Sequence, residues 1–327
     1  MGYFFGIGGN DTQLVCQRVA EAAAREGYEL TVVGVPKTID NDLGDQEFKL
    51  LDHTPGYGSV ARYWACYIQN ANEENRGSSP SDPVLVIQAM GRRIGFIPAA
   101  ARLADPEREM PLQIYLAESG LTLEELAENV NSCLKQHGRA IVVVSEGFPI
   151  KETELGAIRD QFGHVQFSAS KLTVAQLVVN YLNEHGLAAQ GVARGQVPGT
   201  DQRDAIIYAS TVDLEEAYQV GQQAVRIAVE EGTGWMATIV RVSNSPYVVR
   251  YDKAPLELMA NSERKFPQEW IAPSRIDVTD DFLEYARPLI GEDWPTVPLV
   301  GGRQRFARLK PVFAPQRCPK YVPQAYR

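Results

Sequence analysis

The 327-residue sequence contains no apolar run close to the roughly 18 residues that a membrane-crossing helix needs. Its first residues lack the basic segment, apolar segment and cleavage site of a signal peptide. Cysteine is scarce, and Cys16, Cys66, Cys133 and Cys318 form no Cys-x-x-Cys pair, which argues against a zinc site or a disulfide framework. These absences predict a cytoplasmic protein with no membrane partner and with reduced thiols.

An excess of positive charge is missing as well. Lys and Arg number 32 against 41 Asp and Glu, a net charge of −9, which argues against a nucleic-acid partner. A local cluster of Arg and Lys can still attract an anionic substrate. Hydrophobic residues make up 44% and charged residues 22%, as in globular proteins, and the length exceeds what one core usually holds. We therefore expect two α/β lobes.

A succession of helix, glycine and apolar strand occurs three times. The glycines are Gly27, Gly138 and Gly186, and the strands that follow them are predicted at 30–35, 140–144 and 188–192. Glycine readily takes the left-handed conformation that ends a helix. A continuous apolar strand is typical of a sheet covered on both faces. The pattern predicts an α/β fold with parallel sheets.

The remaining elements follow from periodicity. Further strands are predicted at 1–7 and 83–87, and helices at 12–25, 121–137, 172–183, 213–231 and 280–286. Prolines become frequent after Ala254, so residues 256–327 are expected to form a C-terminal wrap around the lobes.

A glycine turn at residues 6–12, GIGGNDT, joins the first strand to the first helix. Such a turn lets a phosphate approach backbone N–H groups at a helix N-terminus. It is not the GxGxxG fingerprint, because Asp11 stands where the third glycine would be, and it is not a P-loop, because no Gly-Lys-Ser/Thr follows. A plain turn with Asn10 or Asp11 as the helix N-cap is an equally open interpretation.

Polar residues follow other predicted strands. Residues 36–42, PKTIDND, follow strand 30–35, and Met90-Gly91-Arg92 and Ser145-Glu146-Gly147 follow two more strands. Open α/β sheets bind ligands at the carboxyl ends of their strands. Paired carboxylates can divide proton transfer and metal binding, and arginines can grip phosphate. Each segment alone could also be an ordinary solvated turn.

Together, GGND, PKTIDND, MGR, SEG and R…GTxQR (Arg194 to Arg203) resemble the 6-phosphofructokinase family, over residues 6–249. The resemblance implies a three-layer α/β fold with parallel sheets and two Rossmann-like lobes. Residues 1–55 and 202–255 would form a donor-binding lobe, and residues 56–201 a fructose 6-phosphate lobe. It also implies an enzyme of glycolysis that acts as a homo-oligomer.

The resemblance assigns roles at the sugar. Asp40 would be the general base on the 1-hydroxyl of fructose 6-phosphate, Thr38 would contact the sugar or the transferred phosphate, and Asp42 would help with Mg²⁺. Glu146 would hold sugar hydroxyls. The other residues expected to bind the substrate are Met90, Gly91, Arg92, Arg194 and Arg203. Such a reaction depends mainly on positioning and charge.

The donor is expected to be pyrophosphate. ATP-using members resemble GGDGS at the glycine turn and have a glycine directly before TIDND. In this sequence Asp11 replaces the glycine at the second-last position of that turn, and Lys37 replaces the glycine before Thr38. This pair of residues resembles the pyrophosphate-dependent branch. Donor contacts are expected from Gly8, Gly9, Asn10, Asp11, Thr12 and Lys37, and Mg²⁺ ligands from Asn10, Asp11 and Asp42. The alternatives are an ATP-dependent 6-phosphofructokinase and a truncated, non-catalytic homologue that binds sugar phosphate.

Some positions depart from the family pattern. Asn10, Thr200 and Pro83 replace an Asp, a His and an Arg that many members carry. Members also have residues before the glycine turn, including a further glycine-rich loop for the donor, so the chain is expected to be N-terminally truncated or a fragment. His53 follows TIDND and is a candidate to support the site, whereas His137 and His185 fit the ends of helices.

Overall fold

The computed structural model describes residues 2–150, 171–260, 262–313, 315–317, 319–320 and 322. The chain divides into two units, Met1–Pro295 and Thr296–Arg327. The second unit contains a small antiparallel pair, β9 (Leu299–Val300) and β10 (Arg303–Gln304). All other elements belong to the first unit.

The first of two four-stranded sheets has the order β1-β2-β7-β8. Its strands are β1 (Gly2–Gly8), β2 (Leu30–Pro36), β7 (Trp235–Asn244) and β8 (Tyr247–Pro255). The first three are parallel, and β8 returns antiparallel to β7. The strands predicted at 1–7 and 30–35 are confirmed, whereas the β7–β8 hairpin has no counterpart in the sequence prediction.

The second sheet has the order β4-β5-β3-β6 and is parallel throughout. Its strands are β3 (Val84–Ala89), β4 (Leu112–Tyr115), β5 (Ala140–Ser145) and β6 (Ala193–Gln196). The strand expected at 188–192 is wrong, because β6 begins at Ala193, directly after the predicted range ends. Leu187 and Ala189 are apolar because they pack against the core cluster on one face of the sheet, although they precede the strand, and the edge strand itself is largely exposed.

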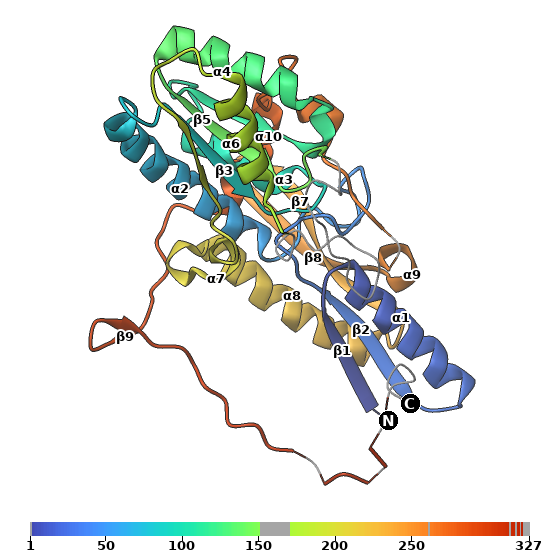
Figure 1. Ribbon diagram of the computed structural model, residues 1–327. Coiled ribbons are helices and arrows are strands. Elements are labelled where there is room, and N and C mark those ends of the chain that lie inside the picture. The colour runs from blue at the N-terminus through green and yellow to red at the C-terminus, as the bar shows by residue number, and fades with distance from the viewer. Residues whose placement is uncertain are drawn as a thin grey trace. The chain divides into compact units, whose positions relative to one another are not determined.

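Helices cover both faces of the second sheet, as Figure 1 shows. Val84 and Val86 face α4 (Leu123–His137) and α6 (Val174–His185). The alternate residues Leu85 and Ile87 pack in the core cluster on the other face. That cluster is built by α2 (Tyr57–Ser78), α3 (Phe96–Ala99), η1 (Ala100–Ala104) and α10 (Asp280–Ala286). Burying each such side chain contributes about 1.5–3 kcal/mol, so these layers supply much of the stability.

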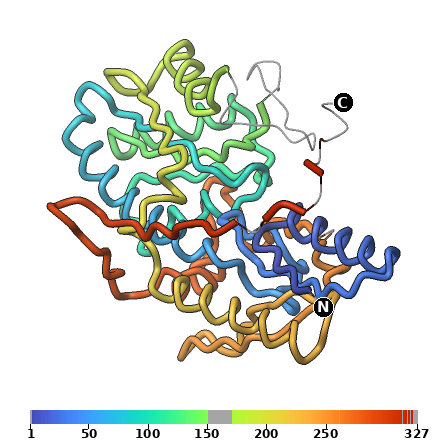
Figure 2. Tube along the Cα trace, turned by 90° about the horizontal axis from the view of Figure 1, so that it is seen from below, coloured from blue at the N-terminus to red at the C-terminus, as the bar shows by residue number. Residues whose placement is uncertain are grey.

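The first sheet is likewise enclosed. Figure 2 shows α1 (Asn10–Arg25) and α8 (Thr211–Glu230) on opposite sides of its strands. A Cβ at Gly34 would overlap the Gln13 side chain, so glycine lets α1 lie close to β2. The short elements of this unit are η2 (Ala117–Ser119), α7 (Asp201–Asp204), η4 (Ile206–Tyr208), α9 (Leu256–Met259), η5 (Gln268–Trp270) and η6 (Arg287–Ile290). These layers confirm the predicted α/β class with mainly parallel sheets.

The helix ends follow local chemistry. Thr122 forms a capping box with Glu125 at the start of α4, and Gly138 ends that helix with a left-handed φ of 72°. The alternative interpretation, in which Asn10 or Asp11 is the N-cap of α1, is wrong: Gly9 is the N-cap, and both polar residues lie in the first turn. Within the described ranges, no helix combines the length and the apolarity that a membrane span requires.

Candidate active site

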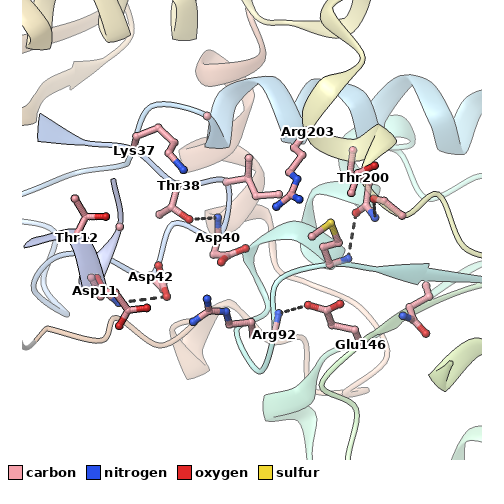
Figure 3. A pocket seen from close by; sticks show the side chains of 18 of the residues that line it. Asp11, Thr12, Lys37, Thr38, Asp40, Asp42, Arg92, Glu146, Thr200 and Arg203 are labelled. Atoms are coloured by element: carbon pink, nitrogen blue, oxygen red, sulfur yellow. Dashed lines mark hydrogen bonds between the residues drawn. The ribbon is translucent and has the colours of Figure 1, made fainter. Parts of the chain in front are cut away.

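A cavity of about 720 Å³ lies at the carboxyl ends of strands from both sheets. Figure 3 shows its acidic and basic side chains converging on a shared space. Predicted site residues that line it are Gly9, Asn10, Asp11, Thr12, Lys37, Thr38, Asp40, Asp42, Met90, Arg92, Glu146 and Arg203. The structure therefore gathers residues that are distant in the sequence into one site.

Two predicted glycines shape the backbone behind this lining. A Cβ at Gly8 would overlap the Thr12 side chain, so glycine allows α1 to start close against β1. Gly91 has a φ of 120° in the turn after β3, where a Cβ would approach the Ile94 carbonyl to 2.8 Å. Both glycines thus position the turns that carry lining residues.

Arg194 is the predicted residue that the structure places elsewhere. Its Nε lies 3.1 Å from Asp82 Oδ1, and the side chain is 66% exposed. It lies on the edge strand β6, before the chain turns towards the cavity, whereas Arg203 lies on α7 at the cavity wall. The expected pairing of Arg194 with Arg203 around one phosphate is therefore not formed in the described part of this chain.

The loop after β2 is fastened to its neighbours. The Lys37 N–H donates to the Gly8 carbonyl at 3.1 Å, and the Thr38 N–H donates to the Pro55 carbonyl at 3.2 Å. The Asp40 N–H donates to Thr38 Oγ1 at 3.2 Å. In Figure 3, Asp40 points into the cavity between Arg203 and Lys37 on one side and Arg92 on the other. The loop thus presents a carboxylate among three cations.

Opposing effects act on the Asp40 carboxyl. Burial raises its pKa above the ordinary value, and the charges of Arg92, Lys37 and Arg203 partly counteract that rise. A carboxylate with a raised pKa is a stronger base than an exposed one. The site therefore supplies a basic oxygen within a positively charged surrounding.

Asp42 and Asn10 form an oxygen-rich corner beside the glycine turn. Asn10 Nδ2 donates to Asp42 Oδ2 at 3.3 Å, and the buried Asn10 Oδ1 has no hydrogen-bond partner among the described residues. Burial, followed by repulsion from Asp40, raises the pKa of Asp42 to about 7. A nearby cation would favour the ionised carboxylate and would satisfy the unpaired amide oxygen.

The donor atoms in this corner are oxygens, which are the ligands that Mg²⁺ prefers. No group of three or more His, Cys, Asp or Glu that could hold a metal occurs in the described ranges. Mg²⁺ commonly takes only one or two carboxylates and completes its shell with water and substrate phosphates. Asn10, Asp11 and Asp42 therefore fit a magnesium ion that is shared with a phosphorylated ligand.

The MGR and SEG segments hold each other in place. The Arg92 N–H donates to Glu146 Oε1 at 2.8 Å, and Ser145 Oγ lies 3.3 Å from the Arg92 carbonyl. A Cβ at Gly147 would overlap the Arg92 backbone, so this close approach requires glycine. Burial raises the pKa of Glu146 to about 7, while the Arg92 N–H opposes that rise. The carboxyl is thus fixed at the cavity wall.

Two glutamines that line the cavity, Gln202 and Gln88, were not predicted from the sequence as site residues. Gln202 Oε1 accepts from Trp64 Nε1 at 3.0 Å and from the Met90 N–H at 3.1 Å, and its Nε2 donates to the Gly199 carbonyl. Gln202 thereby joins the turn after β3 to α7. Gln88, which also lines the cavity, accepts from the Ala175 N–H at 3.1 Å. Only the GTxQR motif carried a signal for Gln202.

Parallel sheets whose strand ends surround a cavity with carboxylates and cations define an α/β protein built to bind phosphorylated ligands. The family model described as "Phosphofructokinase" matches residues 1–228. The chain belongs to the phosphofructokinase family, as its motifs predict.

Individual relatives refine the comparison. A protein named pyrophosphate–fructose 6-phosphate 1-phosphotransferase from Methylococcus capsulatus is 36% identical over 326 residues, covering 97% of this chain and 74% of that protein. A crystal structure of pyrophosphate-dependent phosphofructokinase from Marinobacter aquaeolei matches with a TM-score of 0.84 and 33% identity, covering 98% of this chain and 75% of that one. An ATP-dependent 6-phosphofructokinase from Trypanoplasma borreli is 28% identical over 239 residues, covering 72% of this chain and 46% of that protein.

Proposed function

We propose that this protein transfers a phosphoryl group from pyrophosphate to the 1-hydroxyl of fructose 6-phosphate, giving fructose 1,6-bisphosphate. The observation that carries the proposal is the position of Asp40 in the cavity, with Lys37 and Arg203 on one side and Arg92 on the other. This arrangement offers a base for a sugar hydroxyl and positive charge for two phosphorylated reactants.

Asp40 would accept the proton of the 1-hydroxyl as that oxygen attacks the transferred phosphorus. The bond from this phosphorus to the bridging oxygen of pyrophosphate breaks, and inorganic phosphate leaves. The raised pKa favours this role, because a stronger base takes the proton more readily. The hydrogen bond between the Asp40 N–H and Thr38 Oγ1 holds the backbone of the base in place. Phosphoryl transfer needs the attacking and leaving oxygens nearly in line, so this positioning accounts for much of the rate.

The sugar would occupy the part of the cavity between Arg203 and Glu146. Arg203 would pair with the 6-phosphate through charge-assisted hydrogen bonds, and Glu146 would accept from a sugar hydroxyl. Arg92 would bring positive charge close to Asp40 and the transferred group, and Met90 would contact the sugar. Since Arg194 lies outside this cavity, Arg203 would bind the phosphate without it in this chain.

Pyrophosphate would occupy the part of the cavity beside the glycine turn. Gly9 and Thr12 border the N-terminus of the 16-residue helix α1, whose dipole favours an anion there. Lys37 would pair with a phosphate oxygen. Asn10, Asp11 and Asp42 would hold Mg²⁺, which when bound neutralises charge on the transferred phosphoryl group.

ATP is the second candidate donor. Asp11 disfavours it, because its carboxylate adds volume and negative charge where a nucleotide α-phosphate would lie, whereas Lys37 can hold a phosphate of the shorter donor. The relative named for pyrophosphate is also more similar to this chain than the one named for ATP. The residues at positions 11 and 37 and the similarity to the relatives therefore both favour pyrophosphate as the donor.

A coupled assay tests the proposal. The purified chain is incubated with fructose 6-phosphate, Mg²⁺ and either pyrophosphate or ATP, and fructose 1,6-bisphosphate is measured. We expect turnover with pyrophosphate and much less with ATP. Turnover with ATP alone would overturn the donor assignment, and no product with either donor would favour a non-catalytic sugar-phosphate-binding protein.

We further infer that this reaction is a step of glycolysis, that it takes place in the cytoplasm, and that the protein acts as a homo-oligomer. The reaction converts one hexose phosphate of that pathway into the next. Size-exclusion chromatography with light scattering measures the oligomeric state directly, and a monomeric mass would contradict the inference of a homo-oligomer.

A further inference from the structure

Asn41 occupies an unusual position between the two acidic residues of the loop. Asp40 and Asp42 flank it in the sequence and line the cavity, whereas its own side chain is fully buried. Its φ is 57°, in the left-handed region that favours glycine and that Asn tolerates better than most other residues. Contacts around a non-glycine residue in this conformation help to hold it there.

Both ends of the Asn41 amide are hydrogen-bonded. Nδ2 donates to the Tyr285 hydroxyl at 2.8 Å, and Oδ1 accepts from the Thr54 N–H at 3.1 Å. Thr54 Oγ1 in turn donates to the Thr38 carbonyl at 2.7 Å. Asn41 therefore ties the turn between the two carboxylates to the segment that precedes α2.

Tyr285 is itself tightly held. Its hydroxyl donates to the Asp52 carbonyl at 3.1 Å while it accepts from Asn41, so a single oxygen joins two backbone segments. Its ring centroid lies 5.3 Å from that of Phe48 and 4.8 Å from that of Trp270. Tyr285 belongs to α10, far along the chain from the loop, and the aromatic cluster leaves its hydroxyl little freedom to move.

We propose that Tyr285 is a positioning residue that acts through Asn41 to hold Asp40 and Asp42 in their reactive orientations. The inference rests on the proposed function. Without the hydroxyl, Asn41 Nδ2 loses its acceptor, and the left-handed turn loses one of its two anchors. Asp40 and Asp42 would then shift together relative to the bound reactants, although Tyr285 itself does not line the cavity.

The first test is Tyr285→Phe, which removes the hydroxyl and keeps the ring. We expect kcat with fructose 6-phosphate and pyrophosphate to fall on the order of tenfold to a hundredfold, with KM nearly unchanged. The matched control is Tyr115→Phe, since Tyr115 is also buried and its hydroxyl donates to Gln113 Oε1 at 2.9 Å in another core cluster. Equal kcat in Tyr285→Phe, Tyr115→Phe and the unmodified protein would overturn the proposal.

A double-mutant cycle tests whether Tyr285 acts through Asn41. Asn41→Gly removes the amide while keeping a residue that tolerates a φ of 57°. In the Asn41→Gly background, Tyr285→Phe should change kcat by less than about twofold, because the two changes remove the same interaction. If the two substitutions instead lowered kcat independently, so that the double variant lost the product of the two single effects, Tyr285 would not act through Asn41. If Tyr285→Phe does not fold, Asn41→Gly tests the anchoring of the turn itself: a fall in kcat without a rise in KM supports it, and an unchanged kcat contradicts it.

Amide hydrogen exchange separates this proposal from the proposed function. Peptides that cover residues 38–45 should exchange faster in Tyr285→Phe than in Tyr115→Phe, whether or not the protein turns over. If the unmodified protein is active but these peptides exchange equally fast in Tyr285→Phe and Tyr115→Phe, the positioning role of Tyr285 is contradicted and the proposed function is not. Absence of activity in the unmodified protein, with faster exchange in Tyr285→Phe, would contradict the proposed function and leave the anchoring of the loop supported.

Discussion

His53 Nε2 lies 2.7 Å from a carboxylate oxygen of Glu216, a residue of α8 that is distant in the sequence. The other ring nitrogen lies 2.7 Å from Asp52 Oδ2, and all three side chains are buried. Arg241 also donates to Asp52, and the Tyr247 hydroxyl donates to Glu216. The segment between the TIDND loop and α2 is thereby joined to α8 and to the β7–β8 hairpin.

This pairing predicts a pH-dependent stability. Burial lowers the pKa of His53, but Glu216 and Asp52 outweigh that effect and raise it to about 9, from an ordinary 6.5. Because the folded pKa is the higher one, the stabilisation from His53 is complete below pH 6.5 and is lost as pH rises towards 9. Urea unfolding across this range should show the free energy of unfolding falling with pH.

The control for that measurement is His53→Gln, which should remove this part of the pH dependence. It should also cost about 3–5 kcal/mol, because Glu216 remains buried without its cation, whereas Asp52 keeps its ion pair with Arg241. His185→Gln, at the exposed end of α6, should change neither property appreciably. A free energy of unfolding that stays constant between pH 6.5 and 9 in the unmodified protein would contradict the account.

Asp40→Ala should abolish phosphorylation of fructose 6-phosphate while sugar binding remains nearly intact. Loss of a general base lowers a rate by about a hundredfold to ten-thousandfold, whereas the contacts proposed between the sugar and Arg203 and Glu146 are kept. The coupled assay gives the rate, and calorimetric titration with fructose 6-phosphate gives the affinity. Asp252→Ala, a change at a partly buried residue of β8 whose side chain pairs with Arg250, is the control. Near-normal turnover in Asp40→Ala would show that another group takes the proton.

The paired change Asp11→Gly with Lys37→Gly should shift donor use towards ATP. It removes a negative side chain near the expected α-phosphate and a cation suited to pyrophosphate. We expect the ratio of kcat/KM for ATP to that for pyrophosphate to rise on the order of tenfold, which corresponds to about 1.4 kcal/mol. An unchanged ratio would remove the argument that these two residues select the donor.

Arg203→Ala should weaken fructose 6-phosphate binding without a comparable effect on pyrophosphate. A hydrogen bond to a charged group contributes about 1.5–3 kcal/mol, so KM for the sugar should rise on the order of tenfold to a hundredfold. The matched control is Arg250→Ala on β8, where an exposed arginine pairs with Asp252. If Arg203→Ala instead raised KM only for pyrophosphate, the sugar and the donor would be assigned to the wrong parts of the cavity.

Much of the fold could be predicted because a buried parallel strand is a continuous apolar run in the sequence. The apolar runs before TIDND, MGR and SEG became β2, β3 and β5 almost residue for residue. The β7–β8 hairpin was missed because most of β8 is only partly buried or exposed, so no continuous apolar run marks it. β6 was misplaced because the edge of a sheet tolerates polar residues such as Arg194.

The site was predictable as a set of strand ends, but its internal contacts were not. Parallel topology brings Arg92 and Glu146, which follow β3 and β5, to one edge of a sheet. Asp40 follows β2 in the other sheet and Arg203 lies on α7, so only the family motifs indicated that they share this cavity. The side-chain direction of Arg194 and the bridging role of Gln202 depend on tertiary packing between distant segments. The same holds for the hydrogen bond between Asn41 and Tyr285, which no spacing pattern in the sequence signals.

A crystal structure of the chain with fructose 6-phosphate bound tests the central claim most directly. We predict the 1-hydroxyl oxygen within about 2.6–3.2 Å of an Asp40 carboxylate oxygen, the 6-phosphate against Arg203, and a sugar hydroxyl at Glu146. A sugar bound in the opposite direction, or outside the cavity that Asp40 lines, would contradict the account.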